Sequence, residues 1–243
     1  MAGAQDSLTA DPLTTTAVAI TGRDRGSVSL SACARAFTRF GSPRVLAAFF
    51  AAFLAARIVV GDWSWRDVAV AAGLIAAQPF TEWLIHVFLL HSRPRHLGRF
   101  TIDLPTARMH RWHHRNPTVL EGVLIPGSLI AGFLVPVTVA MWLLSWPLAL
   151  TGGTHAGLLL TLMMASCVLV ATYEWCHFLI HTPYRPKRRY YRNIWRSHRL
   201  HHFKNEHFWF GVSSDAADRV LGTSPEQGSV PRSETVKSLG VSG

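Results

Sequence analysis

Charged residues are scarce in this chain: they make up 16% of its 243 residues, whereas hydrophobic residues make up 49%. Acidic residues are the scarcer kind, with 14 Asp and Glu against 24 Lys and Arg, and the formal net charge is +10. A composition this apolar is unusual for a soluble domain of this length. The combination of an apolar and a basic chain therefore indicates a membrane protein rather than a nucleic-acid binder.

Cysteine is nearly absent, and its pattern excludes two kinds of site. Cys33, Cys167 and Cys176 are odd in number and lack C-x-x-C spacing, which argues against a disulfide framework and against a thiolate zinc site. The H-E-x-x-H motif does not occur either, so a zinc metalloprotease is disfavoured. Histidine is the abundant residue instead, with 13 copies.

Both ends of the chain are polar. Residues 1–42 are rich in Ser, Thr, Asp and Gly and lack the pattern of a signal peptide, so we predict disorder there, with a short amphipathic piece near Ala32–Phe40. Residues 224–243 are predicted to be a polar C-terminal tail. A single domain is expected between them, over residues 43–223.

Four segments are apolar enough to cross a bilayer, which takes about 20 residues. They are residues 45–60, 67–91, 120–149 and 155–181. Arg57 in the first segment is expected to snorkel outward. Three prolines interrupt the third segment, which favours a kinked or re-entrant form over a pair of short helices. We therefore predict an all-α, multi-pass membrane protein of about four helices, to which the basic residues and histidines described next add a cytoplasmic, histidine-rich, metal-binding cap.

The distribution of basic residues predicts the orientation. Residues 92–119 carry six Arg, residues 185–199 carry seven Arg and Lys, and the connection at 151–157 has neither. The positive-inside rule then places both termini and the middle loop in the cytoplasm. The excess of Arg over Lys suggests a bacterial source, and hence the plasma membrane. The basic run at 184–196, interleaved with Tyr and Trp, is predicted to lie on anionic lipid headgroups.

Ten histidines fall into two half-sets of five. Each half-set has two histidines at the end of an apolar segment and three in an H-x-x-H-H motif, which suggests a duplicated hairpin whose copies each supply half of one site. The ten are His86, His91, His110, His113, His114, His177, His181, His198, His201 and His202.

Helix geometry gives these spacings a meaning. At 100° per residue, H-x-x-H-H presents three imidazoles to one side, and His177 and His181 share a face. His86 and His91 are five residues apart, about 140° on an ideal helix, so they need a distorted turn or different metals. Ten close imidazoles cannot all be protonated, and neutral imidazole is a metal ligand. Ten ligands exceed the needs of one ion and fit two, and all-nitrogen sites suit iron, zinc, copper or nickel.

Two carboxylates and a group of aromatic residues lie close to the histidines in sequence. Glu82 and Glu174 are within apolar segments, where carboxylates are costly, and each is placed to accept the free N–H of a ligating imidazole. Tyr173 beside Glu174 is a weaker candidate for the same role. An aromatic group beside the last histidine motif is predicted to line a channel at the site: Phe203, Phe208, Trp209 and Phe210.

In this combination and order, the four histidine motifs resemble those of the fatty acid hydroxylase/sterol desaturase superfamily of membrane histidine-box oxygenases, and most closely its fatty acid 2-hydroxylase branch. The resemblance covers about residues 42–223 and includes the stretch "FGVSSDAADRVLGT" at 210–223, with Phe210, Gly211 and Asp218. It implies that the ten histidines hold a dinuclear metal centre, with iron for catalysis, although zinc can occupy such sites. It also implies O2 as co-substrate and insertion of one oxygen atom into a lipid chain, with C2 of a fatty acyl chain favoured.

The resemblance also bears on partners. Some members carry an N-terminal haem domain that supplies electrons, and residues 1–42 are too short for one, so a separate electron-donor protein is implied. The partners expected are thus this donor, a lipid or fatty acyl substrate and membrane lipids, with no nucleic acid.

Rival functions stay open. Within the superfamily, the chain could be a sterol or carotenoid oxygenase or a desaturase. From another class, it could be a membrane metal transporter or metal-binding protein, although transporters place their ligands near the midplane. A bis-histidine haem protein would need only four histidines within the spans, which would leave the H-x-x-H-H motifs unused.

Overall fold

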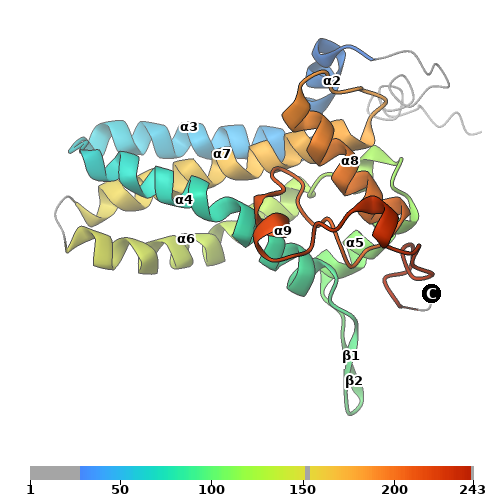
Figure 1. The fold of residues 1–243 in the computed structure, drawn as a ribbon. Coiled ribbons are helices and arrows are strands. Elements are labelled where there is room, and N and C mark those ends of the chain that lie inside the picture. Colours follow the sequence, from blue (N-terminus) through green and yellow to red (C-terminus); the bar gives the residue numbers. More distant parts are fainter. Residues whose placement is uncertain (1–27, 151–153, 242–243) are drawn as a thin grey trace, which may run out of the picture.

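The computed structural model describes residues 28–150 and 154–241, and the disorder predicted for residues 1–27 lies outside this part. The described chain is a bundle of long helices with a cap of short elements at one end (Figure 1). The long helices are α3 (Gly41–Val60), α4 (Trp65–Leu84), α6 (Gly127–Ala149) and α7 (His155–His181). A π-helix, η1 (Ile85–Leu90), continues α4, and a 3₁₀ turn, η2 (Leu120–Gly122), precedes α6.

The short elements gather at the end of the bundle where η1 and α7 finish (Figure 1). They are α2 (Leu30–Phe37), the hairpin of β1 (Arg95–Leu97) and β2 (Phe100–Ile102), α5 (Pro105–Arg115), α8 (Arg189–Phe203), α9 (Ala216–Val220) and η3 (Gln227–Ser229). The prediction of an all-α protein with four membrane-crossing segments is confirmed, since four helical segments are long and apolar enough to span a bilayer.

The surface of the bundle is that of a protein immersed in lipid. The apolar windows of the four segments have mean hydropathies of 1.5 to 2.1, yet only 11% to 33% of each window is buried within the protein. Their apolar side chains therefore face outward, which water would not tolerate over so large an area. Exposed tryptophans ring the end remote from the cap, as expected at a lipid–water interface: Trp63, Trp65, Trp142 and Trp146.

The third segment forms one continuous helix, α6, over most of its length. Pro126 lies directly before the first residue of the helix, where its missing N–H removes no helical hydrogen bond. Pro136 and Pro147 lie inside α6 without ending it. Membrane helices accommodate such prolines because neighbouring helices and local adjustments satisfy the freed carbonyls.

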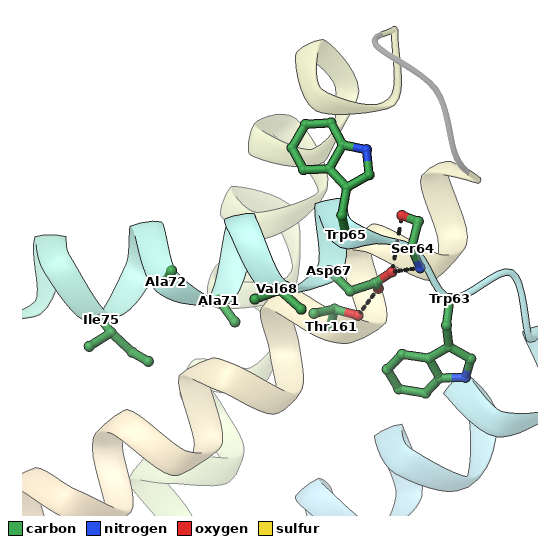
Figure 2. Close-up of a pocket in the computed structure, with 9 residues that line it drawn as sticks. All are labelled: Trp63, Ser64, Trp65, Asp67, Val68, Ala71, Ala72, Ile75 and Thr161. Atoms are coloured by element: carbon green, nitrogen blue, oxygen red, sulfur yellow. Dashed lines mark hydrogen bonds between the residues drawn. The ribbon is translucent and has the colours of Figure 1, made fainter.

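Arg57 does not snorkel outward. Its side chain is 1% exposed and forms an ion pair with Asp67, with 2.7 Å between Nη2 and Oδ1. Asp67 also accepts hydrogen bonds from the Thr161 hydroxyl and from the Ser64 backbone N–H (Figure 2). The expectation was wrong because a buried carboxylate in the first turn of α4 offers Arg57 a closer partner than the headgroups. This cluster joins α3, α4 and α7 at the end remote from the cap, beside an open hollow flanked by Trp63 and Trp65.

Both polar ends of the chain pack onto the domain. Residues 28–42, expected to be disordered, include α2, whose Cys33 and Ala36 lie in a core cluster with Phe178 and Leu124. The short amphipathic piece expected near Ala32–Phe40 corresponds to this helix. Residues 224–241, expected to be a tail, bury three apolar side chains among their polar ones: Val230, Val236 and Leu239. The packed unit therefore extends beyond residues 43–223 on both sides.

Replacing Asp67 tests the buried cluster. Asp67→Ala leaves the Arg57 guanidinium buried without its carboxylate, and we expect it to lower the free energy of unfolding by about 3–5 kcal/mol. The ion pair between Asp215 and the exposed Arg219 is the matched control, and Asp215→Ala should cost about 0–1 kcal/mol. Denaturant titration in detergent micelles measures both, and equal losses in the two variants would contradict this account of Arg57.

Candidate metal centre

The ten predicted histidines converge at the cap and separate into two groups of five. The groups are His86, His91, His110, His114 and His201, and His113, His177, His181, His198 and His202. Within each group, one ring nitrogen per residue lies within 4.8 Å of the others. Most of these side chains are fully buried, and the remaining three histidines of the chain, His96, His155 and His207, lie outside both groups.

The two groups do not coincide with the two half-sets of the sequence. Each group takes two histidines from the end of a long helix and an i,i+4 pair from a short helix: His110 and His114 on α5, or His198 and His202 on α8. The fifth member crosses over, since His113 of α5 joins the second group and His201 of α8 joins the first. Residues four apart are about 40° apart around a helix, whereas adjacent residues are 100° apart, so each short helix faces both groups.

The π-helix resolves the unfavourable spacing of His86 and His91. In η1 the backbone N–H of His91 donates to the carbonyl of His86, five residues back, at 3.1 Å. This wider turn brings residues i and i+5 to the same side, and the two ring centroids are 5.0 Å apart. The structure thus contains the distorted turn that the spacing requires.

Backbone carbonyls fix the orientation of four imidazoles. The Nδ1 atoms of His86 and His201 lie 2.6 and 2.8 Å from the carbonyl oxygens of Phe210 and Phe208. Those of His114 and His181 lie 3.0 and 2.7 Å from the carbonyls of Val236 and Pro117. A carbonyl oxygen only accepts hydrogen bonds, so each Nδ1 carries the proton and each Nε2 keeps its lone pair.

The inward-facing nitrogens of the described histidines lie against one another or have no hydrogen-bond partner. Nε2 of His110 lies 3.1 Å from Nε2 of both His86 and His114, and Nε2 of His198 and His202 are 2.9 Å apart. Adjacent nitrogen ligands at about 2.1 Å from one ion are about 3 Å apart. Among the described residues, buried ring nitrogens of seven of the ten have no hydrogen-bond partner: those of His91, His113, His177, His181, His198, His201 and His202. Both groups therefore fit a metal ion bound by nitrogen.

The electrostatic surroundings keep the cap histidines neutral. Burial, followed by the neighbouring imidazoles, holds the pKa of His110, His198 and His202 well below the usual histidine value. Burial also lowers the pKa of His114 to about 3, although its bond to the Val236 carbonyl acts the other way. Neutral rings have the lone pairs that a metal needs, so neutral solution favours ligation.

Glu82 and Glu174 do not contact the imidazoles that they were expected to orient. Glu82 accepts hydrogen bonds from the backbone N–H of Val212 and from both the N–H and the hydroxyl of Ser213. Glu174 accepts from the Ser42 hydroxyl and from the Ile125 N–H. Glu82 therefore ties the loop at Val212 and Ser213 to α4, whereas Glu174 ties the start of α3 and the segment before α6 to α7. Tyr173 lies beside the second group, with its ring centroid 5.6 Å from that of His177.

The loop tied by Glu82 carries the carbonyls that orient His86 and His201. Asp218 holds its other side, since its carboxylate accepts from the N–H groups of Phe210 (3.0 Å) and Gly211 (2.7 Å). A Cβ at Gly211 would lie 2.0 Å from the Ser214 carbonyl oxygen, so this position requires glycine. Two buried carboxylates and one glycine thus determine where the loop presents its carbonyls.

The four aromatic residues of the predicted channel lie away from the apolar cavity. Phe203, Phe208, Trp209 and Phe210 do not line the cavity described below, and Phe210 instead packs against the rings of His86, His91 and His201. Phe203 is partly exposed beneath the side chains of Arg199 and Lys237. These residues are on the cap, whereas the apolar cavity is within the bundle. The aromatic residues of the cap carry no information about which faces of the long helices point inward.

An apolar cavity of about 490 Å³ runs inside the bundle and ends at the histidines. Side chains of α3, α4, α6 and α7 line it, among them Phe53, Leu74, Met141 and Met163 at the remote end. At the cap end its walls include histidines of both groups: His86 and His110 of the first, and His113 and His177 of the second. Tyr173 also lines it. An apolar ligand in this cavity would therefore contact both groups.

Sequence reasoning missed several residues that position the site. The carbonyls of Pro117 and Val236 could not be identified from the sequence as partners of the histidines, because every residue carries a carbonyl. The i,i+4 pairing that assigns the histidines to two groups was present in the motif, since residues four apart are the closest on a helix surface.

The fold and the site define a helical membrane protein with a paired histidine centre. The chain belongs to the fatty acid hydroxylase family, whose model matches residues 71–223. It is similar to the dihydroceramide fatty acyl 2-hydroxylase FAH2 of Arabidopsis thaliana, with 27% identity over 63% of this chain and 61% of the relative. It is also similar to the human fatty acid 2-hydroxylase, with 30% identity over 60% of this chain and 37% of the relative.

A solved structure shares the fold. The structure of full-length Scs7p, in which only the hydroxylase domain is visible, superimposes with a TM-score of 0.58 at 20% identity. The match covers 78% of this chain and 68% of that one. The chain spans about three fifths of the length of the Arabidopsis thaliana relative and little more than a third of the length of the human one.

Replacing Glu82 tests whether it acts on the loop rather than on a histidine. Glu82→Ala removes three hydrogen bonds, each worth about 1.5–3 kcal/mol when the acceptor is charged, so amide hydrogen exchange of residues 208–214 should accelerate strongly. Glu82→Gln keeps one acceptor oxygen and should give a smaller acceleration. The exposed Glu121→Ala is the control, and unchanged exchange at 208–214 in Glu82→Ala would refute the role.

Proposed function

We propose that the protein is a membrane-bound, O2-dependent hydroxylase that oxidises a fatty acyl chain at two histidine-held metal ions. The observation that carries this proposal is the apolar cavity whose walls include histidines of both groups. A cavity of this kind brings an unreactive carbon chain directly to the metals. Membership of the fatty acid hydroxylase family supports the same reaction class.

Ten histidines would hold the two ions, five each in the groups given above. Iron is the metal expected for catalysis, and zinc also suits these ligands. The metal pair would supply the activation of O2. The protein would supply neutral imidazoles and would fix their orientation through backbone carbonyls. It would also supply a dry environment in which the oxidant reacts with the substrate rather than with water.

The length of the cavity fits a long acyl chain. Fourteen residues of α7 separate Met163 from His177, and twelve residues of α4 and η1 separate Leu74 from His86. At 1.5 Å per residue these distances are about 21 and 18 Å. Extended chains with carbon–carbon bonds of about 1.5 Å advance about 1.25 Å per carbon, so about 16 carbons fit.

The position of oxidation follows from this placement. With the chain end near Leu74 and Met163, only carbons close to the carboxyl end lie beside the histidines. The polar end of the substrate would then lie toward the cap. Position C2, which the names of the plant and human relatives specify, meets this condition. Tyr173 lines the cavity beside His177, where it would contact the substrate.

The environment of the protein forms part of the proposal. We place the cap and both termini in the cytoplasm because the basic residues gather at the cap, and we place the chain in a bacterial plasma membrane because Arg is in large excess over Lys. Two electrons per turnover would come from a separate donor protein. The cap is the only end at which a cytoplasmic donor could approach the metals.

Two alternatives differ in their physical requirements. A sterol or carotenoid oxygenase, or a desaturase, of the same superfamily would use the same metals, and product analysis separates these from an acyl hydroxylase. A metal transporter needs a path for ions across the membrane, whereas the walls of this cavity are almost entirely apolar within the bundle. The cavity therefore favours a lipid chain over an ion.

The metal content and the reaction product can be measured on the same preparations. We expect about two transition-metal ions per chain in protein purified in detergent, and lipids hydroxylated at C2 of the acyl chain in expressing cells. His113→Ala and His201→Ala each remove one ligand of a different group, so each should lower metal content and abolish the product. His96→Ala, outside both groups, should change neither quantity.

Plasma mass spectrometry and lipid mass spectrometry give the two readouts. Folded protein without iron or zinc, isolated without chelators, would refute the metal centre. Two ions per chain together with desaturated or sterol products would support the metal centre and contradict the hydroxylation of an acyl chain.

The remote end of the cavity should set the length of acyl chain that is accepted. Leu74→Trp fills this end and should shift the hydroxylated products to shorter chains, whereas Met163→Ala enlarges it and should admit longer ones. Val168→Trp is the control, because Val168 is on the outward face of α7 and is 51% exposed. Chain-length profiles from mass spectrometry that match the wild type in both cavity variants would exclude this binding mode.

A further inference from the structure

The β1–β2 hairpin is amphipathic. Its register pairs Arg95 with Ile102, His96 with Thr101 and Leu97 with Phe100. Paired residues point to the same side and successive pairs alternate. One face therefore carries Leu97, Phe100 and Ile102 with Arg95, and the other carries His96 and Thr101.

The apolar face is unusually exposed. Leu97, Phe100 and Ile102 are 60%, 61% and 50% exposed, and all six strand residues are exposed. The guanidinium of Arg99, in the turn, lies 5.0 Å from the centre of the Phe100 ring. A two-stranded hairpin in water is marginally stable at best, and three large apolar side chains on one face favour a partner surface.

The base of the hairpin is held firmly to the metal-bearing cap. Arg111 of α5 donates to both carboxylate oxygens of Asp103, directly after β2, at 2.5 and 2.6 Å. The same guanidinium donates to the Ser92 carbonyl, before β1, at 2.9 Å. Arg111 is buried and lies between the histidines of the α5 motif. The hairpin therefore projects as a supported arm.

The location of the arm points to the membrane surface. It starts five residues after the second spanning segment ends at Leu90, and it projects sideways from the bundle at the cap end, across the direction of the long helices (Figure 1). A segment so placed lies at the level where the spans leave the bilayer. Leu90 and Thr106, which flank the arm in sequence, both line the cavity, so the arm emerges beside the cap end of the cavity.

We propose that the hairpin is a membrane-surface anchor that binds an anionic phospholipid bilayer. Leu97, Phe100 and Ile102 enter the boundary between headgroups and acyl chains, and Arg95 and Arg99 contact lipid phosphates. His96 and Thr101 face water. Bound in this way, the arm holds α5 and the cap end of the cavity at the lipid surface. The proposal does not depend on the metals or on the reaction.

Spin labels on the two faces test the anchor in the full-length protein. Leu97→Cys and Thr101→Cys are labelled separately, and the protein is reconstituted in nanodiscs of phosphatidylcholine with or without phosphatidylglycerol. The native cysteines that the structure describes, Cys33, Cys167 and Cys176, are buried, and the parent protein controls for their labelling. Power saturation then compares how often the spin label collides with oxygen, which is concentrated in lipid, and with a nickel chelate, which is confined to water.

The ratio of oxygen to nickel collisions should be severalfold higher at position 97 than at position 101. It should rise further at position 97 when phosphatidylglycerol is present, and Arg95→Gln with Arg99→Gln should abolish this rise. Phe100→Cys against His96→Cys repeats the comparison, so one poorly folded variant does not decide the result. Nickel access equal at both faces would overturn the anchor and favour a water-soluble partner, and independence from phosphatidylglycerol would overturn its anionic specificity.

Discussion

The burial of ten neutral imidazoles at one end of a membrane bundle is the constraint on which the rest of the structure depends. Their ring nitrogens face inward at separations near 3 Å, and lone pairs held so close repel one another unless cations lie between them. Four rings are turned inward by backbone carbonyls that accept hydrogen bonds from their Nδ1–H groups. The loops and the C-terminal segment that supply these carbonyls consequently have to be ordered, which explains why residues 224–241 pack on the cap.

The membrane bundle and the cap contribute different parts of the site. The bundle supplies an apolar cavity about as long as an acyl chain, and the cap closes it with polar ring nitrogens. Buried carboxylates join the two parts: Glu82 and Asp218 hold the 208–213 loop, and Glu174 links α7 to Ser42 at the start of α3. At the remote end, Arg57, Asp67 and Thr161 join three helices. Polar groups inside the bundle are thus paired structural contacts, which lipid surroundings demand.

Sequence reasoning was most successful where local spacing carries the information. Apolar runs predicted the four spans, because the thickness of a bilayer imposes a length on each, and the segment from His155 to His181 has the bounds of α7. Histidine spacing selected the ten residues that converge. It also indicated that His86 and His91 need either a distorted turn or different metals, and the structure contains the turn as η1. The sequence did not reveal the hydrogen-bond partners of Arg57 and of the two glutamates, or the place of the apolar cavity, because each depends on contacts between residues far apart in the sequence.

The sequence by itself determined the membrane setting, the histidine inventory and the family resemblance, since these depend on residue type and on separation along one helix. Only the tertiary structure decided the exchange of His113 and His201 between the groups, the carbonyls of Phe208, Phe210, Val236 and Pro117 as partners, and the path of the cavity. The physical reason is that every residue carries a carbonyl and every apolar helix has several faces. Which carbonyl and which face meet the histidines depends on how distant segments pack.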